Sequence, residues 1–112
     1  MVQKNSFIEV AIGKYENPVE AFNELRGIYS YNMTFITGTI AQKEKMVMIE
    51  DKKRINPFFI AEKKLEEDWI KGKKAPVGCV EIKRSYLKKI KEKYGLKGKQ
   101  RIKAFIFFGW YN

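Results

Sequence analysis

The chain has 112 residues, of which 45% are hydrophobic and 14% aromatic, and its formal net charge is +10. This composition predicts one domain over residues 1–112 with a single core, and it disfavours disorder. The absence of histidine excludes Ser-His-Asp and Cys-His nucleophile systems and histidine-ligated zinc. The lone cysteine, Cys79, excludes an internal disulfide.

The apolar stretches of the chain are short. The longest of them, Ala104–Trp110, is far shorter than the roughly 20 residues of a membrane-spanning helix. The first residues also lack the apolar block of a signal peptide. We therefore expect a cytoplasmic protein that has no membrane partner. Cys79 lies in one of the apolar runs, so we expect a buried structural thiol there.

The first half of the chain predicts a strand, a helix and a hairpin. Residues 6–13 alternate in the manner of a strand. Asn17, followed by proline, is a typical N-cap, and the helix that it begins is expected to stop at Gly27. Residues 32–41 are rich in Thr, Phe and Ile, and residues 45–50 follow after a polar turn. These two segments predict the arms of a hairpin.

The second half predicts two helices and two strands. Asn56, again followed by proline, is expected to cap a helix over residues 58–70. Residues 77–82 read as a buried strand. Ser85 is expected to cap a third helix that ends at Gly95. Residues 102–110 predict a last strand that is apolar on both faces.

The predicted order of elements is β-α-β-β-α-β followed by α-β. The first six elements resemble the ferredoxin-like double split βαβ arrangement. The expected fold class is therefore α+β, with a ferredoxin-like βαββαβ core, an appended αβ unit and a mainly antiparallel sheet. The last strand must be covered on both faces, either within the chain or at a dimer contact.

Charge is distributed unevenly along the chain. Residues 1–51 carry five basic and seven acidic side chains, a net charge of −2, whereas residues 52–112 carry eighteen and six, a net charge of +12. The densest stretch, Lys83–Lys103, holds ten basic side chains and one acid, Glu92. Such an excess creates a local positive field that attracts polyanions. The preferred hypothesis is a small basic nucleic-acid-binding protein without catalysis, with DNA and RNA both open.

The candidate phosphate contacts come from this stretch. In the third helix, an apolar stripe of Leu87, Ile90 and Tyr94 should face the core, which leaves the lysines in solvent. Most of the cations are lysines, which act as point charges on phosphate, so binding should be salt-sensitive and weakly sequence-specific. The candidates are Lys83, Arg84, Lys88, Lys89, Lys93, Lys97, Lys99, Arg101 and Lys103.

A second hypothesis starts from the triplet Glu81-Ile82-Lys83 at the end of a predicted strand. It resembles the second half of the PD-(D/E)xK nuclease signature. That resemblance implies a second acid, for which Asp51 and Asp68 are the candidates, two acids that hold Mg²⁺, and a lysine that orients the attacking water. The Pro-Asp half is absent. Under the preferred hypothesis no metal or other cofactor is expected.

The remaining alternative is a protein-binding module, such as an accessory or inhibitor protein of a mobile element or virus. The apolar surplus near the C-terminal end motivates it. The partner would be another protein or a second copy of the chain, held through an apolar surface. This alternative ranks below nucleic-acid binding because it does not explain the charge, and the nuclease ranks third.

Overall fold

Four strands form one open, mainly antiparallel sheet in the order β1-β4-β3-β2. Their bounds are β1 (Ser6–Gly13), β2 (Met46–Met48), β3 (Val77–Ile82) and β4 (Lys103–Trp110). Strand β4 pairs antiparallel with both β1 and β3, and β2 pairs parallel with β3. The computed structural model describes residues 6–32, 40, 43–50, 56–72, 74–95 and 101–110, and only the backbone of residues 28–32 and 84.

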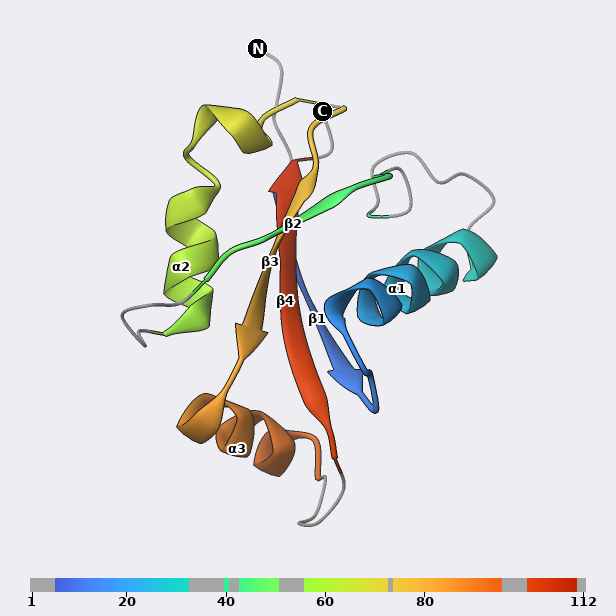
Figure 1. Ribbon diagram of the computed structural model, residues 1–112, viewed down its shortest axis with the longest axis vertical. Helices are drawn as coiled ribbons and strands as arrows, with labels where there is room; N and C mark the ends of the chain where they lie inside the picture. Colours follow the sequence, from blue (N-terminus) through green and yellow to red (C-terminus); the bar gives the residue numbers. More distant parts are fainter. Residues whose placement is uncertain are drawn as a thin grey trace.

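Helices α1 (Pro18–Asn32) and α2 (Pro57–Lys64) lie on opposite faces of this sheet (Figure 1). Helix α1 covers one face and α2 the other, while α3 (Arg84–Lys93) lies at the end of the sheet where β3 stops and β4 starts. Within the described residues, no helix combines the length and the apolarity needed to cross a membrane.

The sheet separates two apolar cores, and β4 contributes to both. On the α1 side, Phe105 and Phe107 pack with residues of α1 and β1, and we call this the α1-side core. On the α2 side, Ile106 and Phe108 pack with residues of α2 and β3, and we call this the α2-side core. Because the α1-side core packs on one face of β4 and the α2-side core on the other, β4 is covered on both faces within the chain, as its two apolar faces required.

The predicted fold class is confirmed: the protein is α+β, with an open and mostly antiparallel sheet that is compatible with a ferredoxin-like core. The detailed strand order differs from a simple double split βαβ, because β4 lies between β1 and β3. The first arm of the predicted hairpin, residues 32–41, lies almost entirely outside the described residues. Its second arm is the short β2, whose described neighbour is the parallel strand β3.

Both asparagine caps are confirmed, whereas two predicted helix ends are wrong. The Oδ1 atom of Asn17 accepts from the Glu20 N–H at 3.0 Å, and that of Asn56 accepts from the Phe58 N–H at 2.9 Å. Helix α1 continues through Gly27 to Asn32. The predicted helix over 58–70 ends at Lys64, because the next residues turn more tightly and a short 3-10 helix, η2 (Asp68–Ile70), follows.

The start of α3 also differs from the prediction. Helix α3 begins at Arg84 with Lys83 in the N-cap position, so Ser85 lies inside the helix and does not cap it. The end is as predicted, since Gly95 has a φ of 69°, the left-handed conformation that glycine adopts without strain. Tyr94, however, is 53% exposed and does not complete the apolar stripe.

Candidate nucleic-acid interface

Helix α3 is held against the sheet by one side of its surface. Ile90 is buried, and Tyr86 and Leu87 are half-buried against the α2-side core. Residues three and four apart lie on one helix face, so these three contacts determine which face of α3 points inward. The opposite face is left to solvent at the end of the molecule (Figure 1).

Lysines are exposed on the part of the α3 surface that is not packed on the sheet. Lys88, Lys89 and Lys93 are exposed, and Lys83 is exposed at the entry to the helix. Lys89 and Lys93 are one turn apart, a spacing at which like charges repel by a few tenths of a kcal/mol. An anion between them removes this repulsion. These three lysines of α3 therefore project to solvent, whereas Lys91 of the same helix is half-buried.

The strand that follows brings two more cations to the same end of the sheet. Arg101 and Lys103 are exposed at the start of β4, where Lys103 pairs in register with Gly13. The Lys103 Nζ donates to the backbone carbonyl of Glu16 at 3.1 Å, so this lysine is partly engaged with the turn after β1. Of the other candidates, Lys97 and Lys99 lie outside the described residues, and Arg84 is described by its backbone alone.

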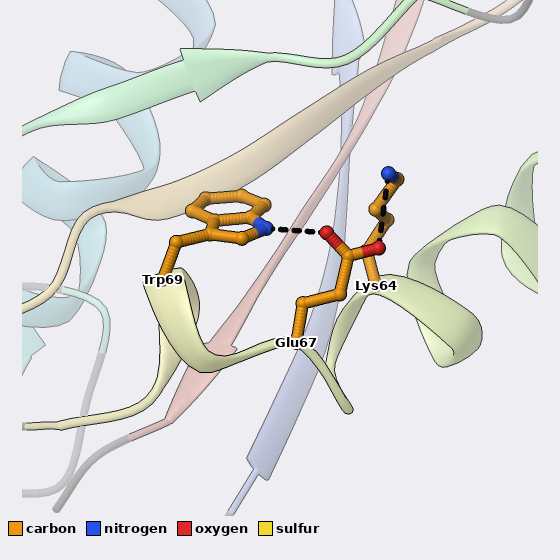
Figure 2. A network of polar contacts seen from close by, with 3 residues as sticks. All are labelled: Lys64, Glu67 and Trp69. Atoms are coloured by element: carbon orange, nitrogen blue, oxygen red, sulfur yellow. Dashed lines mark hydrogen bonds and ion pairs between the residues drawn. The ribbon is translucent and has the colours of Figure 1, made fainter.

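The acidic residues Glu66, Glu67 and Asp68 form no described ion pair with the lysines of α3. Glu67 pairs instead with Lys64 of α2 at 3.0 Å and accepts from the indole N–H of Trp69 at 2.7 Å (Figure 2). The hydrogen bond from Lys64, then that from Trp69, lowers the pKa of Glu67. Among the described ion pairs, none joins an acid to a lysine of α3.

The nuclease candidates are not gathered into one site by the described structure. Glu81 is half-buried near the end of β3, and Lys83 is exposed directly after it. Asp68 lies on η2, which precedes the start of β3, whereas Glu81 lies near the end of β3. The two acids are therefore at opposite ends of this strand (Figure 1). Asp51 lies outside the described residues. Among those described, no three acidic or cysteine side chains are grouped as metal ligands.

Cys79 is a structural thiol, as the apolar run around it predicted. Its side chain is fully buried in the α1-side core. Burial, with a smaller effect from the Glu81 carboxylate, raises the pKa of the thiol to about 12. The thiolate, which is the nucleophilic form, is therefore strongly disfavoured in the folded protein.

One residue of the α3 surface was assigned to the wrong environment by sequence reasoning. Tyr94 follows the last helical residue, so the helical period that placed it with Ile90 no longer applies. The position of Tyr94 directly before Gly95, a typical helix stop, was the sequence signal that the helix ends before this residue. Comparisons of the chain with protein-family models, curated proteins and solved structures found no match.

Proposed function

We propose that the protein is a small, non-catalytic nucleic-acid-binding protein that contacts phosphates through α3. The observation that carries this proposal is the exposure of Lys88, Lys89 and Lys93 on a helix that is packed on the core through Tyr86, Leu87 and Ile90. A polyanion is the partner that such a basic helix surface attracts. A cytoplasmic location belongs to the same proposal, because nucleic acid is accessible there.

Weak sequence preference follows from the chemistry of the contacts. Lysine ammonium groups act as point charges on phosphate oxygens, which are the same for every sequence. Arginine can recognise a base through two parallel hydrogen bonds from its planar guanidinium group, but the stretch Lys83–Lys103 contains only two arginines, Arg84 and Arg101. We expect affinities for unrelated sequences of equal length to agree within a few-fold. The separation of Asp68 from Glu81 supports a binding role over a nuclease.

A charge-matched pair of variants tests the proposal. The first replaces Lys88, Lys89 and Lys93 by glutamine, and the control replaces Lys45, Lys71 and Lys74, three lysines exposed elsewhere. Fluorescence anisotropy with labelled DNA and RNA oligonucleotides, over a salt series, measures the affinity. The α3 variant should lose affinity at least tenfold. Its dependence of log K on log salt should become shallower by roughly 0.7 to 0.9 per lost contact.

The control variant should bind within a few-fold of the wild-type protein. Equal losses in the two variants would show that overall charge, and not α3, drives binding. Undetectable binding of the wild-type protein at low salt would end the proposal altogether. Circular dichroism confirms that both variants are folded.

A second candidate function, self-association or binding of a protein partner, is favoured by the surface of β2. Val47 and Met48 are 41% and 43% exposed on a strand at the edge of the described sheet. Light scattering over a concentration series should detect a dimer that Val47→Lys dissociates. Val19→Lys is the matched control, because Val19 is equally apolar and 52% exposed on α1. A monomer at all concentrations argues against the homodimer.

A further inference from the structure

The side chain of Tyr94 is exposed, although its backbone is held in place by hydrogen bonds. Tyr94 is the C-cap residue of α3, and its N–H donates to the Ile90 carbonyl at 3.1 Å. The N–H of Gly95 donates to the Glu92 carbonyl, also at 3.1 Å. The side chain is nevertheless 53% exposed. An aromatic ring is thus presented at a defined position at the end of the basic helix.

Neither a cation nor a second aromatic ring of the described residues stacks on the ring of Tyr94. Other rings near the surface carry a cation: Lys89 Nζ lies 5.9 Å from the ring centroid of Tyr86, and Lys63 Nζ lies 4.8 Å from that of Phe59. Tyr94 carries no such described cation and is 53% exposed, so much of its side chain is accessible to a planar ligand.

The charges around Tyr94 differ from those around Phe59, the other exposed aromatic residue of the described part of the chain. Phe59 is 45% exposed on α2, but the acids of that region, Glu62, Glu66, Glu67 and Asp68, are all exposed as well. Tyr94 directly follows Lys93, and the one acid of α3 is Glu92. Within the described part of the chain, the α3 surface is therefore where an exposed ring and lysines without a described ion pair occur together.

We propose that the preferred ligand of the α3 surface is a single-stranded nucleic acid, with a base stacked on Tyr94 and phosphates on Lys89 and Lys93. This inference rests on the proposed function and narrows its substrate class. A stacking ring combined with a cationic track is the arrangement by which proteins hold single strands without reading sequence. Inside a duplex both faces of each base are covered by neighbouring pairs, so Tyr94 can add little to duplex binding.

The test compares a single-stranded oligonucleotide with the duplex of the same sequence, by anisotropy at fixed salt. Tyr94→Leu should weaken single-strand binding roughly 5- to 150-fold, the effect of losing one stacked base, and should change duplex binding less than twofold. Tyr94→Phe keeps the ring and should retain the wild-type affinity. Phe59→Leu is the matched control, since it removes a ring of similar exposure from α2.

The outcomes separate this inference from the proposed function. One outcome is that the wild-type protein binds both the single strand and the duplex in a salt-dependent way while Tyr94→Leu leaves both affinities unchanged or lowers them equally. In that case the stacking role of Tyr94 is wrong and phosphate binding by α3 stands. If Phe59→Leu weakens single-strand binding as much as Tyr94→Leu, the assignment to α3 is wrong. If neither form binds at low salt, both proposals fail.

Discussion

The Nζ atom of Lys43 donates a hydrogen bond to the backbone carbonyl of Gly72 at 3.1 Å. It donates a second, of the same length, to the carbonyl of Ala75. The Lys43 side chain is only 2% exposed, and burial lowers its pKa. These bonds join the segment before β2 to the loop before β3, next to the bond from the Val77 N–H to the Lys45 carbonyl. A buried ammonium group thus helps to bring two parallel strands together.

Replacing Lys43 by methionine should lower the free energy of unfolding by about 1–3 kcal/mol. Methionine fills similar space but leaves the carbonyls of Gly72 and Ala75 without this donor, and an unsatisfied buried acceptor has a cost of that order. Urea unfolding followed by circular dichroism measures the difference. Lys45→Met, at an exposed position two residues away, should stay within about 0.5 kcal/mol of the wild-type protein. Equal stabilities of the two variants would show that the hydrogen bonds of Lys43 contribute nothing.

Gly78 is the position where the sheet has no room for a side chain. It pairs in register with Phe108, whose ring is fully buried in the α2-side core. A Cβ atom on Gly78 would lie under 3.0 Å from three atoms of that ring. Gly78→Ala should therefore destabilise the protein by about 1–3 kcal/mol through overpacking. Urea unfolding of the purified variant measures this loss.

Two further variants decide whether overpacking is the cause. Gly27→Ala should stabilise the protein by about 0.5–1 kcal/mol, because Gly27 lies inside α1 with nothing within 4 Å of an added Cβ. In Gly78→Ala/Phe108→Leu the loss from the alanine should shrink, since the smaller side chain makes room and neighbouring changes are not additive. Strictly additive losses at Gly78 and Phe108 would contradict this account.

Much of the fold could be predicted because its signals are local. Strands β1 and β3 have the predicted bounds, and β4 starts one residue later than predicted, because alternation or continuous apolarity extends over their full length. Asn17 and Asn56 were recognised as caps because an asparagine before a proline satisfies the first free N–H groups of a helix.

The remaining features depend on tertiary contacts that no local pattern contains. Gly27 is compatible with both a helix end and a helix interior, and here the helix continues. The parallel pairing of the three-residue β2 with β3 involves partners some thirty residues away in the sequence. The exposure of the α3 lysines could be anticipated from helical spacing, whereas the separation of Asp68 from Glu81 follows from the path of the chain around β3.

Cys79 should make the stability of the protein fall as the pH rises above about 9. The pKa of its thiol is raised from 9.0 to about 12, so the unfolded chain releases the proton earlier than the folded protein does. The stabilising contribution is therefore complete below pH 9 and is lost as the pH approaches 12. Between pH 8 and pH 10 this single group should lower the free energy of unfolding by roughly 1 kcal/mol.

Urea unfolding of the wild-type protein and Cys79→Ala at pH 8 and pH 10, with a phosphine reductant present, isolates this effect. The wild-type protein should lose roughly 1 kcal/mol more than the variant over that interval. Tyr15, whose pKa burial and Glu24 raise from 10.0 to about 12, acts in the same direction but is present in both proteins, so it cancels in the comparison. Equal losses in the two proteins would mean that the Cys79 thiol ionises as easily in the folded core as in the unfolded chain, contrary to its complete burial.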